Sequence, residues 1–209
     1  MKLTKTREIV VIPLSLSMIF SLLIINSINN QQVIAQDVFF GEPPQQGPIQ
    51  SLDNAGLVYQ SPVYEIRTQY PDGWEIVIQN TSNSTFSLRF NSPLENDTDS
   101  FRENVRLVIN TVSNNTDMSN FTSATLTSYL ESYPDVEFTR LSSTNLTSSA
   151  IPAYELVASR TQEGLNFMQV FAIHENKVYS IIYNSEKSRY STYLPIIEEM
   201  INSFEMTRG

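Results

Sequence analysis

The sequence predicts an α+β fold, an α/β/α sandwich in which helices cover both faces of a central, mainly antiparallel sheet. Two kinds of pattern predict it. Apolar and polar side chains alternate through residues 64–70, which is the period of a half-buried strand. Apolar residues recur at helical spacing in residues 123–133 and again in residues 190–204. Each of these two stripes is available to cover one face of the sheet.

Eight strands are expected, and the first three form an antiparallel meander. The turn at residues 71–73, Pro-Asp-Gly, joins the first two strands. On the third strand, Ser87, Arg89 and Asn91 are expected to face water. The last two strands are apolar on both faces and therefore need cover on both sides. The predicted strands are residues 64–70, 74–78, 86–90, 105–112, 136–141, 153–159, 165–173 and 178–183.

The two predicted helices have different end signals. For residues 123–133, Thr122 is the expected N-cap and Pro134 the terminator. In the closing stripe, Pro195 removes a backbone donor and clashes with the preceding turn. The second helix is therefore expected to start close to Pro195 or to kink there.

The chain opens with a membrane-targeting segment. Lys2, Lys5 and Arg7 precede an apolar run over residues 9–28. Small side chains allow cleavage after Ala35, but the run is also long enough to remain as an anchor that spans the bilayer. In both cases the positive end stays inside and the rest of the chain faces outward, either secreted or membrane-anchored. The expected organisation is a signal peptide or anchor over residues 1–35, a flexible stalk rich in Pro and Gly over 36–58, and one domain over 59–207.

Charge and composition exclude several classes of protein. Acidic residues number 22 and basic residues 13, so the basic surface that nucleic acid requires is missing. The absence of cysteine excludes disulfides, thiolate nucleophiles and cysteine-ligated metals. His174 is the only histidine, and neither a Gly-x-Ser-x-Gly elbow nor a phosphate-binding glycine loop is present. We therefore expect no catalytic residues and no cofactor, with His174 as a polar residue at a strand end.

An acidic loop offers a candidate calcium site, because alternating carboxylates can wrap this ion. An EF-hand comparison fails, since Ser100 stands where glycine is required and Arg106 where the bidentate glutamate belongs. The alternative is a solvated acidic loop. The candidate ligands are Glu95, Asp97, Asp99 and Glu103.

Six Asn-x-Ser/Thr sequons, none blocked by proline, make the exported region a candidate glycoprotein. All six are expected in turns or loops, where a glycan can be accommodated. The alternative is that these Asn and Ser residues serve turn formation alone. The sequons begin at Asn80, Asn83, Asn96, Asn114, Asn120 and Asn145.

Tyrosines form a further candidate site, a ligand groove between helix and sheet. Helical and strand periodicity explains most of them as core residues instead. The tyrosines concerned are Tyr129, Tyr133, Tyr179, Tyr183, Tyr190 and Tyr193.

Several short motifs, taken in order, resemble the PsbP domain family. They are Tyr70-Pro-Asp-Gly-Trp74, Phe90-Asn-Ser-Pro93 followed by Asp99-Ser-Phe-Arg-Glu-Asn-Val105, Lys177-Val-Tyr-Ser180 and the closing helix over residues 196–204. The resemblance implies the sandwich of the Mog1/PsbP-like group and a role as an exported accessory or binding domain. The best-known members are extrinsic subunits that help photosystem II retain calcium and chloride. The leader departs from a plastid transit peptide, so the resemblance does not extend to photosynthesis, and the family supplies no active-site signature.

These observations predict an extracytoplasmic PsbP-like accessory or binding domain without catalytic activity. Its acidic face is expected to bind an unknown protein or small ligand at the outer membrane surface, and the leader anchors the domain in the membrane if it stays uncleaved. Three alternatives remain open: a structural envelope glycoprotein, a weak calcium- or small-ligand-binding protein, and a carboxylate-based hydrolase.

Overall fold

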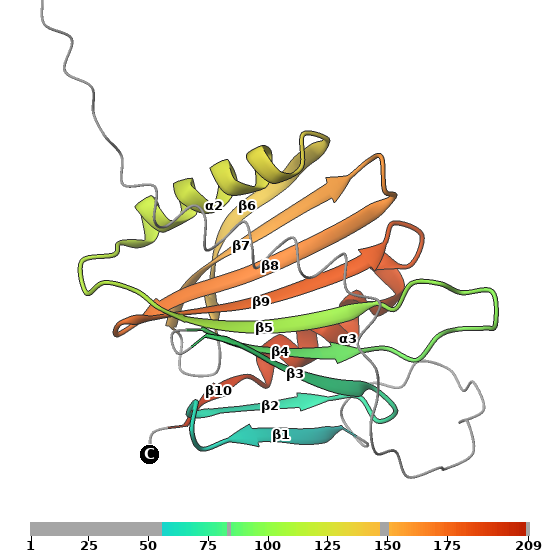
Figure 1. Cartoon of the computed structure of the whole chain (residues 1–209), viewed down its shortest axis with the longest axis horizontal. Helices are drawn as coiled ribbons and strands as arrows, with labels where there is room; N and C mark the ends of the chain where they lie inside the picture. The colour runs from blue at the N-terminus through green and yellow to red at the C-terminus, as the bar shows by residue number, and fades with distance from the viewer. Residues whose placement is uncertain (1–55, 83–84, 147–150, 208–209) are drawn as a thin grey trace, which may run out of the picture.

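The computed structural model describes residues 56–82, 85–146 and 151–207, which form ten strands and two helices (Figure 1). The predicted leader and residues 36–55 of the predicted stalk lie outside this part of the chain. Within the described ranges, no helix is both long and apolar enough to cross a membrane. The elements are β1 (Leu57–Ser61), β2 (Ile66–Tyr70), β3 (Glu75–Ser82), β4 (Thr85–Asn91), β5 (Asn104–Thr111), α2 (Met118–Ser132), β6 (Val136–Leu146), β7 (Ile151–Arg160), β8 (Leu165–His174), β9 (Lys177–Glu186), α3 (Tyr190–Asn202) and β10 (Glu205–Met206).

The strands form two antiparallel sheets. The large sheet has seven strands in the order β3-β4-β5-β9-β8-β7-β6, and the small sheet has three in the order β1-β2-β10. Most neighbours in the large sheet follow each other along the chain, but β5 pairs with β9. This pairing joins the first half of the domain to the second. In the small sheet, β10 pairs with β2 and brings the last strand beside the first two.

One core lies between the large sheet, the small sheet and α3. On β4, Phe86, Leu88 and Phe90 are each at most 2% exposed and point into this core. From the opposite side, Ile197 and Met200 of α3 pack onto the same layer. The strand period of two and the helix period of 3.6 thus place apolar side chains against one another.

A second core lies on the other face of the large sheet, beneath α2, which runs roughly along the strand direction on the β6–β7 side of the sheet in Figure 1. Tyr129 of α2 stacks on Phe167 of β8 with ring centroids 4.8 Å apart. Phe121, near the start of the helix, contacts Phe171 with centroids 5.5 Å apart. Helices therefore cover both faces of the sheet, which confirms the predicted α+β class.

The predicted three-strand meander is wrong in its first member, because β2 pairs with β1 and β10 and not with β3. The small sheet that results is absent from the sequence prediction. It exists because β1 and β10 both pair with β2. β1 begins at Leu57, inside the predicted stalk, and most of its residues are at least partly exposed, so no apolar alternation marks it. β2 begins at Ile66, after residue 64 where the predicted strand starts. Glu65 has a φ of 55°, which interrupts the extended chain.

α2 begins earlier than predicted, and α3 begins before Pro195. Asp117, not Thr122, caps α2, because its carboxylate accepts a hydrogen bond from the Asn120 N–H at 2.9 Å. Thr122 lies inside the helix, where its hydroxyl donates to the Met118 carbonyl at 2.7 Å. α3 begins at Tyr190 and continues through Pro195, so a start close to this proline is wrong.

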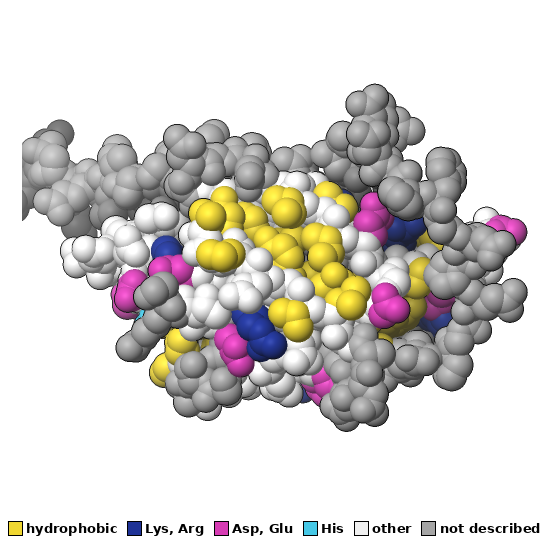
Figure 2. Space-filling model, turned by 90° about the horizontal axis from the view of Figure 1, so that it is seen from below, with side chains coloured by type: hydrophobic (Ala, Val, Ile, Leu, Met, Phe, Trp, Pro, Cys, Tyr) yellow, Lys and Arg dark blue, Asp and Glu magenta, His cyan; other side chains and the backbone are white. Residues whose placement is uncertain are grey.

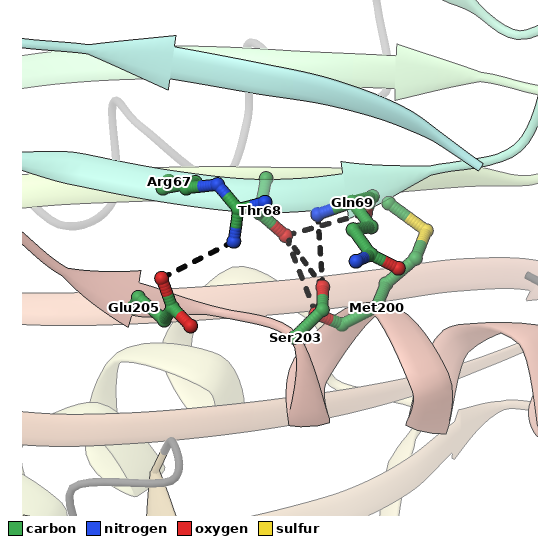
Figure 3. A network of polar contacts seen from close by, with 6 residues as sticks. All are labelled: Arg67, Thr68, Gln69, Met200, Ser203 and Glu205. Carbon is green, nitrogen blue, oxygen red and sulfur yellow. Dashed lines mark hydrogen bonds and ion pairs between the residues drawn. The ribbon is translucent and has the colours of Figure 1, made fainter. Parts of the chain in front are cut away.

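A polar network ties the end of α3 to β2 (Figure 3). The Ser203 hydroxyl accepts from the Gln69 N–H at 2.9 Å and donates to the Met200 carbonyl at 2.8 Å. The Thr68 hydroxyl lies 3.3 Å from both the Met200 carbonyl and the Ser203 hydroxyl. These contacts satisfy the Met200 carbonyl near the end of the helix and the Gln69 N–H of β2, and they hold α3 against the small sheet.

Apolar side chains also reach the surface on the side of the molecule that carries β1. Figure 2 shows them as a stripe across the middle of that side. β1 and β3 each lie at the edge of a sheet, and within the described residues no further strand pairs with them. Tyr59 and Ile76, which are partly buried, connect the stripe to the first core. The large apolar residues that remain exposed on these strands and the turn after β1 are Leu57, Val58, Val63 and Ile78.

Candidate functional site

The acidic loop between β4 and β5 does not gather its carboxylates around one point. Asp99 accepts hydrogen bonds from the Glu95 and Phe101 N–H groups, at 2.9 and 3.0 Å. Glu95 forms an ion pair with Arg189, next to the start of α3, and Asp97 is exposed. Among the residues that the structure describes, no three His, Cys, Asp or Glu side chains are placed to hold a metal ion. The geometry therefore gives the candidate calcium site no support.

Glu103, the fourth candidate ligand, is enclosed at the end of this loop. It is 1% exposed, and its Oε1 accepts a hydrogen bond from the Ser185 hydroxyl at 3.4 Å. Burial raises the pKa of the Glu103 carboxyl, and the charges of Asp99 and Glu186 add to the rise while backbone hydrogen bonds oppose it. A raised pKa favours the protonated carboxyl, whereas a calcium ligand must be ionised.

The six tyrosines do not line one groove. Tyr129 and Tyr133 belong to the core beneath α2, whereas Tyr179, Tyr183 and Tyr193 are buried in the core beneath α3. Tyr190, the first residue of α3, is partly buried and stacks on Tyr183 with ring centroids 5.1 Å apart. Two cores on opposite faces of the sheet thus account for these side chains.

His174 lies at the end of β8, opposite Lys177 across the hairpin to β9, and is partly exposed. No hydrogen bond or ion pair among the described residues joins it to a serine or a carboxylate. Its position at the end of a strand is the predicted one.

The sequons do not all lie in turns or loops. Two of them do, at Asn96 and Asn114, but three lie in regular elements and one, at Asn83, lies outside the described residues. The loop prediction is wrong for those three because β3, α2 and β6 extend further than the sequence patterns indicate. The three sequons in regular elements begin at Asn80 in β3, Asn120 in α2 and Asn145 in β6.

Two arginines stand directly opposite each other on the α2 side of the large sheet. Arg89 of β4 is in register with Arg106 of β5; Arg106 is 2% exposed and Arg89 partly exposed. Arg106 Nε donates to the Ser87 hydroxyl at 2.8 Å. Gln169 of β8 and Ser180 of β9 continue the same face, with Gln169 Nε2 donating to the Ser180 hydroxyl at 3.3 Å. We call these five residues the arginine face.

The arginine face is an unfavourable setting for two positive charges. Burial, together with the charge of Arg89, lowers the pKa of Arg106 to about 10, and the Tyr129 hydroxyl opposes this shift. Burial also lowers the pKa of Arg89, with Glu75 opposing. Glu75 is itself held by Arg102 in an ion pair of 2.6 Å. Like charges on directly opposed strand residues destabilise a sheet, so this arrangement requires an explanation.

Within the described ranges, Arg89 forms no ion pair, whereas most other arginines of the domain do. Among the described residues, its Nε is buried without a hydrogen-bond partner. A guanidinium group presents its donors as a planar fork that matches two oxygens of a carboxylate, phosphate or sulfate. Arg89 is therefore equipped to bind an oxyanion that approaches the arginine face. The arginines with ion pairs are Arg67, Arg102, Arg140, Arg160 and Arg189.

The sequence patterns did not identify the arginine face. Alternation along β4 places Ser87 and Arg89 together, but the expectation that Ser87 faces water is wrong, since it is 0% exposed. The reason is that Arg106, from the neighbouring strand, bonds to the Ser87 hydroxyl. The feature of the sequence that could have indicated this face is Arg106, an arginine within a strand that is apolar on both faces.

The fold is similar to that of several solved proteins. Cyanobacterial PsbP (CyanoP) from Synechocystis sp. PCC 6803 matches with a TM-score of 0.55 and 14% sequence identity, over 79% of this chain and 99% of that one. A Pseudomonas aeruginosa protein of unknown function, PA94, matches with a TM-score of 0.49 and 15% identity, over 75% of this chain and 99% of that one. LpqN, involved in cell envelope biogenesis of Mycobacterium tuberculosis, has a TM-score of 0.49 and 13% identity, over 78% and 91% of the two chains. At these identities the likeness concerns the fold.

Sequence comparison identifies the family directly. No curated protein matches the chain. The family described as PsbP-like protein, however, matches residues 42–206, which is most of the chain and nearly all of the described domain. The chain therefore belongs to the PsbP-like protein family and shares the fold of cyanobacterial PsbP.

Proposed function

We propose that this chain is an extracytoplasmic, non-catalytic binding domain that takes up a small oxyanion, or a ligand carrying an anionic group, at the arginine face. The observation that carries the proposal is the register pair of Arg89 and Arg106. Two like charges in register, one buried and one partly exposed, oppose folding, and an anion beside them relieves their repulsion.

The arginine face favours binding over catalysis. A nucleophilic serine needs a histidine or carboxylate within hydrogen-bond reach as its base. In the described part of the chain, the Ser87 hydroxyl bonds to Arg106, and the Ser180 hydroxyl bonds to Gln169. Neither partner is a base at neutral pH. The chemistry that remains is recognition of negative charge.

The extracytoplasmic placement rests on the leader. Its basic start and its apolar run over residues 9–28 direct everything beyond residue 35 to the outer side of the membrane. Peptide mass spectrometry of the native protein tests this placement. A first peptide that begins at Gln36 demonstrates a cleaved signal, and a peptide from Met1 in the membrane fraction demonstrates an anchor. An intact leader in the cytosolic fraction would contradict export.

Thermal unfolding with added anions tests the proposed ligand class. The probes are phosphate and sulfate at constant ionic strength, with chloride as the reference anion and calcium and a chelator as separate arms. A ligand at about 100 times its Kd stabilises the native state by about 2.7 kcal/mol. For a domain of this size, that corresponds to a rise in melting temperature of roughly 5–10 °C. We expect this rise with phosphate or sulfate and not with calcium.

A pair of variants locates the effect. Arg89→Gln removes one guanidinium group from the arginine face and should abolish most of the anion-induced rise. Arg140→Gln removes a surface arginine that is ion-paired with Glu155, and should leave the rise unchanged. An equal rise in Arg89→Gln would place the anion elsewhere. A rise with calcium alone would favour the calcium-binding alternative, and no rise with any probe would favour a structural envelope protein; both results contradict the proposal.

A further inference from the structure

The sequon Asn96-Asp97-Thr98 lies in the loop between β4 and β5, which projects beyond the end of the large sheet (Figure 1). Asn96 is exposed, and its Oδ1 accepts three hydrogen bonds. They come from the Thr98 hydroxyl at 2.6 Å, the Thr98 N–H at 2.9 Å and the Asp99 N–H at 3.1 Å. Asn96 Nδ2 bonds to no described residue. The side chain of this exposed residue is thus fixed by its oxygen, and its nitrogen is left without a described partner.

These hydrogen bonds bear directly on the chemistry of glycan attachment. An amide nitrogen is a poor nucleophile because its lone pair is delocalised onto the carbonyl oxygen. Donors on Oδ1 stabilise negative charge at that oxygen and so ease the loss of a proton from Nδ2. Once this proton is lost, the nitrogen carries electron density that can form a bond to a sugar. In this sequon, Thr98 supplies two of the three donors.

The sequon at Asn120 has the opposite geometry. Asn120 lies in the first turn of α2, and its Nδ2 donates to the carboxylate of Asp117, the helix N-cap. The hydroxyl of Thr122, the third residue of this sequon, donates to the Met118 carbonyl and not to Asn120. The nitrogen is therefore occupied and the oxygen lacks the hydroxyl donor, so this sequon is poorly arranged for attachment.

The sequon at Asn114 is intermediate. Asn114 is exposed, but the hydroxyl of Thr116 lies 3.1 Å from the Ser113 hydroxyl, and the Thr116 N–H donates to the Ser113 carbonyl at 3.0 Å. Of the three sequons whose Asn and Thr side chains are both described, Asn96 alone has its own threonine hydroxyl on its amide oxygen.

We propose that Asn96 is the preferred N-glycosylation site of the exported chain. In the transfer, a base takes one proton from Nδ2, and the nitrogen bonds to the anomeric carbon of a lipid-diphosphate-linked glycan. The bond between that carbon and the diphosphate oxygen breaks, and the lipid diphosphate leaves with the bonding electrons. The inference rests on the extracytoplasmic placement proposed above, since the loop must meet the glycan donor outside the cytoplasm. It does not depend on anion binding at the arginine face.

Glycopeptide mass spectrometry on the native protein and three full-length variants tests the inference. We expect a glycan mass on the peptide that contains Asn96. Thr98→Val keeps the shape of the side chain but removes the hydroxyl, and should lower occupancy at Asn96 at least tenfold. Thr98→Ser restores the hydroxyl and should restore occupancy. The matched control, Thr122→Val, removes the hydroxyl from the helical sequon and should leave the glycan on Asn96 intact.

Two results would overturn the inference. One is a bare Asn96 in exported protein, as defined by its N-terminal peptide or by its presence in the membrane fraction. The other is a glycan at Asn96 whose occupancy is unchanged in Thr98→Val. If the leader is intact and the protein cytosolic, a bare Asn96 overturns the placement and the inference together. Melting temperatures of the variants, measured in parallel, separate loss of the glycan from loss of the fold.

Discussion

Glu103 is a carboxyl group that the fold encloses between two other acids. It is 1% exposed, and Asp99 and Glu186 both act on it. Because burial disfavours the charged form, the pKa of the Glu103 carboxyl is raised in the folded state above its ordinary value of 4.5. Between these two values the folded protein binds more protons than the unfolded chain. Stability therefore decreases as pH rises through this window.

Replacing Glu103 by Gln tests this linkage. In the native protein, the Glu103 contribution to the free energy of unfolding is fully present below pH 4.5 and is lost as pH rises through the raised pKa. The amide of Glu103→Gln does not ionise. The free energy of unfolding of this variant, relative to that of the native protein, should therefore increase with pH across that range. Urea unfolding at several pH values measures the difference. Glu137→Gln, at an exposed position of β6, is the control, and an unchanged pH slope in Glu103→Gln would contradict the argument.

At the scale of elements, the contact between α3 and β2 depends on one hydroxyl. Ser203 accepts from the Gln69 N–H, at a point of β2 that β10 does not reach. Ser203→Ala leaves this partly buried donor without an acceptor, and should lower the free energy of unfolding by about 1–2 kcal/mol. The midpoint of urea unfolding measures the loss. Ser119→Ala, at an exposed position of α2, should change stability by less than about 0.5 kcal/mol.

Strands with a clear two-residue period could be predicted, and elements fixed by partners distant in the sequence could not. Ile66 and Tyr70 of β2 alternate with polar residues, and the structure buries them as predicted. β10 has only two residues, so no period can mark it; its place is set by pairing with β2. The start of α2 was misplaced because Asp117 and Thr122 are both good N-caps, and only the backbone shows which one is used.

The candidate sites also depend on partners that are distant in the sequence. Glu95 and Asp99 share a loop, as the sequence predicts, but whether they could bind a cation depends on Arg189, which arrives from the far end of the chain to pair with Glu95. The arginine face depends on the β4–β5 register, which brings Arg89 opposite Arg106. Periodicity gives the face on which each side chain lies, whereas register and tertiary packing decide which charges meet.

At the scale of the whole molecule, β2 joins the two ends of the domain. β1 and β10 pair with its two edges, and Phe204, just before β10, is 1% exposed in the core beneath α3. Its ring meets that of Tyr179 edge-on, with centroids 6.2 Å apart. The first core and the small sheet are therefore completed by Phe204 and β10, which follow every strand of the large sheet in the sequence.

A truncation series tests how much Phe204 and β10 contribute to the stability of the domain. A chain that ends at Ser203 loses Phe204 and the pairing of β10, and should lose at least the roughly 3–5 kcal/mol that removal of a buried phenylalanine side chain costs. A chain that ends at Thr207 keeps both, together with the hydrogen bond from the Thr207 N–H to the Glu65 carbonyl at 2.7 Å, and should unfold like the full chain. Phe204→Ala in the full chain separates the ring from the strand. If the chain ending at Ser203 unfolds at the same urea concentration as the one ending at Thr207, the large sheet and its helices hold together without the small sheet's last strand.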